Sequence, residues 1–145
     1  MARPRETPIG LQLATTAKAV GRAFNDALVE VGGSLPTWLV LRSLKAGQPE
    51  TQLELARQIG IEGPTLTRHL DGLERDGLIR RRRAAGDRRA VRVEVTAAGD
   101  TLHDELLKAV IAFDRQLTAG MSEQELSRLR QSLERLEKRF RPSLD

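Results

Sequence analysis

The sequence contains no cysteine. This absence excludes disulfide bonds, zinc sites with thiolate ligands, iron–sulfur clusters and any sensor that works through a thiol. The only histidines, His69 and His103, are too few for a metal site built from imidazoles. We therefore expect neither a metal nor a cofactor.

Aromatic residues are also scarce, with one tryptophan, three phenylalanines and no tyrosine among 145 residues. Proteins that bind single-stranded nucleic acid stack bases on aromatic side chains, so the composition argues against this class. No uncharged stretch approaches the ~18 residues of a membrane span, and the first residues lack the apolar run of a signal peptide. We expect one globular domain in the cytoplasm, without membrane contact.

The positive charge is concentrated in one short segment. Residues 80–92 hold seven arginines and one aspartate, a net charge of +6, whereas the whole chain carries +4. The remaining residues therefore sum to −2. A concentrated cationic patch on a nearly neutral protein is typical of a protein that binds a polyanion such as nucleic acid.

Capping residues and glycines divide the first half of the chain into four predicted helices. Thr7 as the N-cap and Pro8 as the first helical residue predict a helix that ends at Gly32 and Gly33. Apolar residues at 3–4 spacing and similar start and stop signals predict three shorter helices, from about Pro36 to Gly47, Thr51 to Gly60 and Pro64 to Gly77.

At the start of the second half, the spacing of apolar residues changes from the 3–4 pattern of a helix to the alternation of a strand. Val91, Val93 and Val95 alternate with charged residues, and this strand is joined to residues 78–83 through a turn-rich segment. Thr96 and Ser122 then cap two long helices. The last helix carries an apolar seam of about two heptads, too short for a free-standing coiled coil, so we expect it to pack in a helical bundle. The seam consists of Leu126, Leu129, Leu133, Leu136 and Phe140.

Two short helices joined by a glycine-containing turn and followed by a hairpin predict a winged helix-turn-helix. The predicted fold is mainly α with a small β-hairpin. We expect an N-terminal helix in residues 1–35, a DNA-binding lobe in residues 36–95 and two C-terminal helices in residues 96–145. The apolar stripe of the first helix suits either the core of one chain or a seam between two copies, and its length favours the seam.

The helix that starts at Pro64 has the face expected of a recognition helix. Leu66, Leu70 and Leu73 lie on its inner side, which leaves Pro64 and Arg68 outward with Thr65 and Thr67 on the flanks. Arg68 could make a bidentate contact to guanine, and the threonines could reach a base edge or a phosphate. The alternative is that Arg68 only forms a surface ion pair with Asp71 or Glu74.

The hairpin tip is the second candidate site. Gly86 allows the turn, and Arg88 or Arg89 could enter the minor groove, where the negative potential is enhanced. Asp87 would hold one of these arginines through a charge-assisted hydrogen bond, and Arg82 would contact phosphate. The alternative is a solvated charge cluster that keeps a strand edge soluble.

Residues 51–99 resemble the MarR family of bacterial transcription regulators, most closely its SlyA-type branch. The resemblance rests on IGIEGPTLTRHLDGLERDGLIRR (59–81) and on the Asp87-x-Arg89 pattern, and the flanking helices match in order and length. It implies a homodimer in the bacterial cytosol, at the nucleoid, with the first and the last two helices forming the dimerisation domain. It also implies DNA contacts at Pro64, Thr65 and Arg68.

Members of this family are usually repressors that a small anionic aromatic or phenolic ligand releases, although some of this branch counteract nucleoid silencing. By analogy, Phe24, Leu28 and Trp38 are candidates to line a ligand pocket, with an ordinary core role as the alternative. His69 is expected to be a partly buried structural residue and His103 a surface residue.

These observations favour a sequence-specific regulator that binds double-stranded DNA as a dimer on a pseudo-palindromic operator. A winged-helix module that binds an acidic protein is the alternative, although the outward face lacks aromatic or methionine anchors. An enzyme is disfavoured because the chain has no nucleophilic cysteine, no P-loop and no dinucleotide-binding glycine pattern.

Overall fold

A computed structural model describes residues 6–47, 51–83, 86 and 90–141. These residues form two compact units, residues 1–111 and 112–145. The first unit holds four helices, a hairpin and the start of a fifth helix: α1 (Ile9–Val29), α2 (Leu35–Gly47), α3 (Gln52–Ile59), α4 (Gly63–Arg75), β1 (Ile79–Arg83), β2 (Val91–Val95) and the first part of α5 (Ala97–Leu117). The second unit holds the end of α5 together with α6 (Glu123–Phe140).

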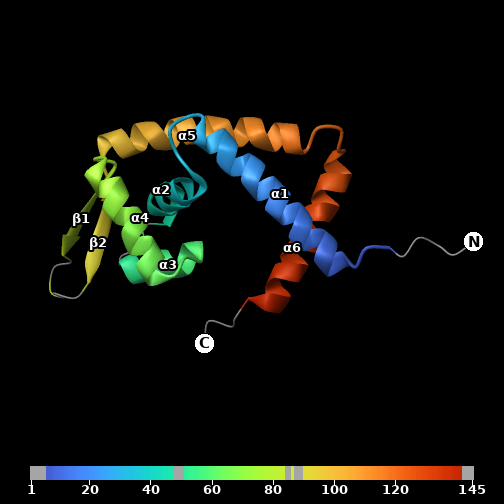
Figure 1. Cartoon of the computed structure of the whole chain (residues 1–145), viewed down its shortest axis with the longest axis horizontal. Helices are drawn as coiled ribbons and strands as arrows, with labels where there is room; N and C mark the ends of the chain where they lie inside the picture. The colour runs from blue at the N-terminus through green and yellow to red at the C-terminus, as the bar shows by residue number, and fades with distance from the viewer. Residues whose placement is uncertain (1–5, 48–50, 84–85, 87–89, 142–145) are drawn as a thin grey trace, which may run out of the picture. The chain divides into compact units, whose positions relative to one another are not determined.

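The observed architecture confirms the predicted winged helix-turn-helix. β1 and β2 form an antiparallel ribbon in which Ile79 pairs with Val95 and Arg81 with Val93. In Figure 1 this ribbon lies beside α3 and α4, and α5 begins where β2 ends. The fold is therefore mainly helical with one small hairpin.

Most of the predicted helix ends agree with the structure. The Thr51 hydroxyl accepts the Glu54 amide, and Gly60 adopts a left-handed conformation (φ 69°) that ends α3. Ser122 and Glu125 form the predicted capping box of α6. The start of α1 was predicted one residue too early, because Pro8 is extended (ψ 136°) and serves as the N-cap in place of Thr7.

The core lies in the first unit. It is built from the inner faces of α2, α3 and α4, one residue from each strand, Leu28 of α1 and Leu106 of α5. The Asn25 side-chain oxygen accepts the Leu35 amide at 2.9 Å, which ties α1 to the start of α2. These contacts hold the helix-turn-helix and the hairpin in one packed body.

The second unit buries much less apolar surface than the first. Within the chain, the α6 seam is half-exposed at Leu129 and Leu133, and Phe140 is 83% exposed. α1 likewise exposes Ile9 and Leu11. Each of the two units, described by itself, thus exposes an apolar helix face.

His103 lies mostly buried and not on the surface, where it was expected. Its ring stacks on Trp38 with 5.2 Å between the ring centroids, and its side chain is only 13% exposed. Its Nδ1 also lies 3.2 Å from an Asp104 carboxylate oxygen. It was predicted to lie on the surface because sequence position alone does not show that α5 packs against α2.

Candidate nucleic-acid interface

The turn between α3 and α4 fixes the start of the recognition helix. After Gly60, the Ile61 amide donates to the Ala56 carbonyl, which closes the end of α3. Glu62 is the N-cap of α4, and Pro64 lies in its first turn, where no amide donor is needed. At the start of α4, Pro64 is exposed to solvent.

α4 divides into the two predicted faces. Leu66 and Leu70 are fully buried and Leu73 nearly so. Arg68 and Thr67 are exposed, Thr65 is half-buried, and His69 is half-buried as expected. Near its N-terminal end, the exposed face presents short side chains and one long cation, Arg68, which suits entry into a major groove.

Arg68 makes no ion pair with Asp71 or Glu74. Both carboxylates bind Arg81 instead, and no acidic partner of Arg68 occurs among the described residues. The surface-pair alternative is therefore wrong for this helix. As far as the described residues go, the guanidinium of Arg68 is available for an external partner.

Thr67 has a defined internal role. Its hydroxyl donates to the Gly63 carbonyl at 3.0 Å and accepts from Gln52 Nε2 at 2.8 Å. The hydroxyl proton is thus committed within the protein, and one oxygen lone pair is left. Sequence reasoning missed Gln52, since nothing in its local pattern places it beside α4.

Arg81 connects β1 to α4. Its guanidinium donates to Asp71 at 2.6 Å and to Glu74 at 3.0 and 3.3 Å, and its backbone amide donates to Glu74 at 2.8 Å. These hydrogen bonds lower the pKa of Glu74 and raise that of Arg81, because each favours the charged form. Arg81 is therefore not part of the free cationic surface, although the sequence grouped it with the other arginines.

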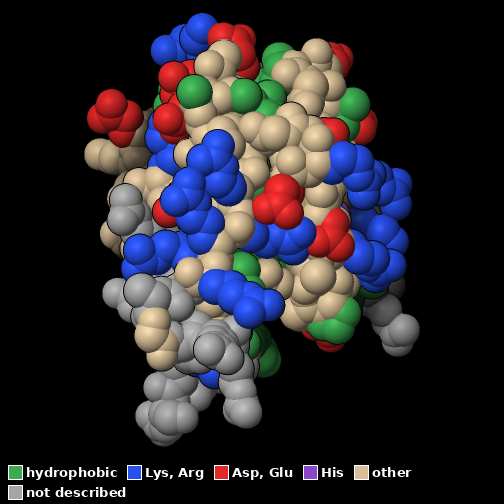
Figure 2. All heavy atoms as spheres, turned by 90° about the vertical axis from the view of Figure 1, so that its left-hand side faces the viewer, with side chains coloured by type: hydrophobic (Ala, Val, Ile, Leu, Met, Phe, Trp, Pro, Cys, Tyr) green, Lys and Arg blue, Asp and Glu red, His purple; other side chains and the backbone are tan. Residues whose placement is uncertain are grey.

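The remaining arginines of the ribbon are exposed. Arg82 lies 3.6 Å from Glu94 across the ribbon, an exposed ion pair worth at most about 1 kcal/mol. Arg80, Arg83 and Arg92 are also exposed. Figure 2, which looks at the side that carries the ribbon, shows Lys and Arg side chains over much of this face with a few acidic ones among them.

The predicted wing-tip residues Asp87, Arg88 and Arg89 lie outside the described residues. Their expected contact with the minor groove stays a prediction. Gly86 is described and has a φ of 85°, a left-handed conformation that favours glycine in the turn.

The ribbon of β1 and β2 is the wing of the winged helix-turn-helix, and hydrogen bonds join its base to α5. The Thr96 hydroxyl donates to the Gly77 carbonyl at 2.6 Å and accepts the Gly99 amide at 3.1 Å. A Cβ added to Gly99 would lie 2.1 Å from the Leu78 carbonyl oxygen, so this approach requires glycine. The end of α4, the ribbon and the first turn of α5 thus meet at one point.

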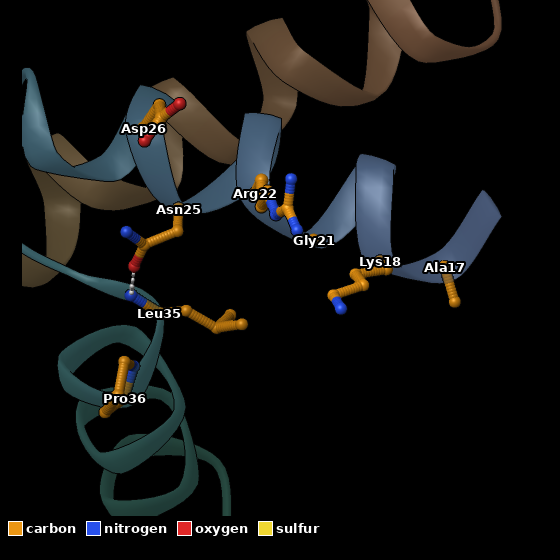
Figure 3. A pocket seen from close by; sticks show the side chains of 8 residues that line it. All are labelled: Ala17, Lys18, Gly21, Arg22, Asn25, Asp26, Leu35 and Pro36. Carbon is orange, nitrogen blue, oxygen red and sulfur yellow. Dashed lines mark hydrogen bonds between the residues drawn. The ribbon is translucent and has the colours of Figure 1, made fainter. Parts of the chain in front are cut away.

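A cavity of about 580 Å³ opens along α1 and the start of α2. Figure 3 shows the cations Lys18 and Arg22 along one wall, with Leu35 and Pro36 at the other end. The predicted pocket residues Leu28 and Trp38 are instead buried in the core, and Phe24 packs against it. None of these three lines this cavity.

Within the described part of the chain, no cluster of His, Cys, Asp or Glu could hold a metal ion. None of its helices has the length and apolar character needed to cross a membrane.

Comparison with known proteins identifies the family. Residues 34–91 match the model of the MarR family. The transcriptional regulator PA3341 is 36% identical, with 91% of this chain and 97% of that chain covered and a TM-score of 0.78. The chain belongs to the MarR family. It is a DNA-binding transcription regulator with a winged helix-turn-helix, and not an enzyme.

Two further transcriptional regulators of known structure share the fold. The M. tuberculosis regulator MOSR, solved in complex with DNA, is 28% identical, with 91% and 95% of the two chains covered and a TM-score of 0.76. The organohalide-sensing regulator RdhR, in a form with bound 2,4-dichlorophenol, is 18% identical, with 97% and 90% covered and a TM-score of 0.81. At that identity RdhR supports the fold alone.

Proposed function

We propose that this MarR-family protein is a repressor that binds a pseudo-palindromic operator as a homodimer. One observation supports the proposal that the binding is sequence-specific. Arg68 stands on the exposed face of α4 with no acidic partner among the described residues, while the neighbouring carboxylates bind Arg81. A free guanidinium beside a small, exposed helix N-terminus is suited to a bidentate contact with guanine.

The proposed division of labour follows from the chemistry of the exposed groups. Arg68 and Thr65 would read base edges, Pro64 would allow close approach, and the remaining acceptor capacity of Thr67 could serve a base or water contact. Arg82 would contact phosphate. Arg88 or Arg89, held by Asp87, would enter the minor groove. Residues 36–95 would form the DNA-binding lobe.

The homodimer is supported by the apolar faces that each unit leaves exposed. Ile9 and Leu11 of α1, and Leu129, Leu133 and Phe140 of α6, present apolar surface that a second copy would cover. Residues 1–35 and 96–145 would then form the dimerisation domain. A C2 dimer places two recognition helices on half-sites about one helical turn apart.

A small anionic aromatic ligand is the proposed release signal. The cavity beside α1 offers Lys18 and Arg22 for a carboxylate or phenolate, and the RdhR structure holds a phenol. Phe24, Leu28 and Trp38 would contribute only if the core opened around them. Thermal-shift screening with aromatic acids tests this proposal, and no stabilisation together with unchanged DNA binding across a broad set would count against it.

Within the family, the pattern of residues 59–81 favours the SlyA-type branch. Some members of that branch relieve nucleoid silencing in place of repressing. A reporter assay of the regulated promoter, with the protein present and absent, separates these two outputs.

The decisive experiment is in-vitro selection of duplex DNA by the purified protein at near-physiological salt. Enrichment of a palindrome with half-sites about 10 base pairs apart is the expected result. Tight, salt-sensitive binding without enrichment would overturn the sequence-specific part. No binding at all would favour the protein-interaction alternative.

A further inference from the structure

The ribbon and the recognition helix are linked through one side chain. Arg81 lies in the middle of β1, and both of its acidic partners, Asp71 and Glu74, lie on the second half of α4. Glu74 also accepts the Arg81 backbone amide, a donor on the outer edge of the two-stranded ribbon. The contact therefore fixes both the side chain and the backbone of β1 against α4.

Arg81 is poorly placed to contact DNA itself. Its side chain is 22% exposed, and its charge is balanced by two carboxylates within hydrogen-bonding distance. Its neighbours Arg80, Arg82 and Arg83 are all exposed. Strand alternation places Arg81 on the same face as the buried Ile79, toward the helix, whereas Arg83, two residues further along this face, is exposed.

We propose that Arg81 is a positioning residue for DNA binding, which holds the wing at a fixed distance and angle from the recognition helix through Asp71 and Glu74. This inference rests on the proposed function, sequence-specific binding by α4 and the wing. The two DNA-binding parts must reach adjacent grooves at once, so a wing already held in place loses less conformational entropy on binding.

The direction in which one substitution changes the affinity for DNA separates this proposal from a simple effect of charge. Glu74→Gln removes a negative charge close to the DNA-binding surface, which by charge alone strengthens binding to any duplex. If Glu74 acts through Arg81, the same change loosens the wing. Binding to the selected duplex then weakens about tenfold, while binding to a duplex of random sequence is unchanged or stronger.

Asp76→Asn is the matched control. Asp76 is an exposed acid at the end of the same helix, with no ion pair among the described residues, so its replacement should leave both affinities unchanged or slightly stronger. Arg81→Lys provides a second variant that keeps the charge but loses the fork of donors. It should lower the affinity for the selected duplex and leave the salt dependence of binding unchanged.

The measurements are dissociation constants for both duplexes at several salt concentrations, taken where circular dichroism shows every variant folded. Arg81→Lys with reduced thermal stability but an unchanged ratio of specific to non-specific affinity would show a merely structural role and overturn the proposal. Glu74→Gln that binds the selected duplex as tightly as the natural protein would overturn it as well. If the natural protein itself does not discriminate between the duplexes, the proposed function fails first, and the inference fails with it.

Discussion

Arg68 projects from the exposed face of α4, whereas Arg81 is held by two carboxylates beside it. The two residues have the same side chain, and only their surroundings differ. A free guanidinium can discriminate between bases, whereas one whose donors are taken up by two carboxylates holds other parts of the protein in place. At the residue scale, the partner of each arginine therefore matters more than the total charge.

Arg68→Ala is expected to weaken operator binding by roughly 1–3 kcal/mol and to relax the preference at one base position. Arg82→Ala should instead weaken binding to all duplexes similarly and reduce the salt slope by about 1. Repeating the DNA selection with each variant, together with a salt titration, checks both effects. Loss of affinity in both variants with unchanged base preference would contradict this division.

Glu74→Gln also carries a prediction for pH. The folded-state pKa of Glu74 lies below its ordinary value of 4.5, so the carboxylate stabilises the fold above that value and loses its contribution as the pH falls through the folded pKa. The difference in unfolding free energy between the natural protein and the variant should be constant near neutral pH and shrink below about pH 4.5. Urea titrations across this range measure it. A difference that grows on acidification would rule out the assigned hydrogen bonds.

At the scale of elements, Gly99 fixes how the wing meets α5. Alanine is normally preferred to glycine in a helix by about 1 kcal/mol. At Gly99 the added Cβ would meet a backbone oxygen at 2.1 Å, and overpacking of this kind costs about 1–3 kcal/mol. The steric cost outweighs the propensity gain.

Gly99→Ala is therefore expected to lower the unfolding temperature. Gly72→Ala is the matched control, because this helical glycine has no atom within 4 Å of the added Cβ, and it should raise the stability by up to about 1 kcal/mol. Thermal unfolding of both variants without DNA is the measurement. Equal stabilisation by the two substitutions would show that Leu78 moves aside freely.

Local signals predicted most of the elements. Thr51, Gly60 and Ser122 act through neighbours within a few residues, so their roles are visible in the sequence. The paired state of Arg81 and the contact between Gln52 and Thr67 depend on how α3, α4 and β1 approach one another. Such contacts join residues from separate elements, and a uniform run of arginines does not show which carboxylates its members will meet.

At the scale of the whole molecule, the α6 seam is the feature that calls for a partner. Leu133 is 44% exposed and Leu129 is 43% exposed, on a helix whose other exposed residues are mostly polar. Exposed leucines in a regular row are unfavourable in water unless another surface covers them. A second copy of the chain is the proposed cover.

Leu133→Glu is expected to convert the dimer to a monomer and to abolish cooperative binding to the two half-sites. Gln131→Glu adds the same charge to an exposed polar position of the same helix and should leave the dimer intact. Sedimentation at several protein concentrations reports the oligomeric state. A natural protein that sediments as a monomer at all concentrations would refute the dimer.

Hydrogen bonds of Thr96 join the start of α5 directly to the base of the wing. One hydroxyl joins Gly77 to Gly99, and the Thr96 amide donates to the Leu78 carbonyl, so the first turn of α5 is bonded to the segment that ends α4. A shift of this turn would therefore break these hydrogen bonds unless the end of α4 and the ribbon moved with it. A ligand that displaced the start of α5 would thus have to act on the position of the recognition helix as well, because the same three hydrogen bonds join the two.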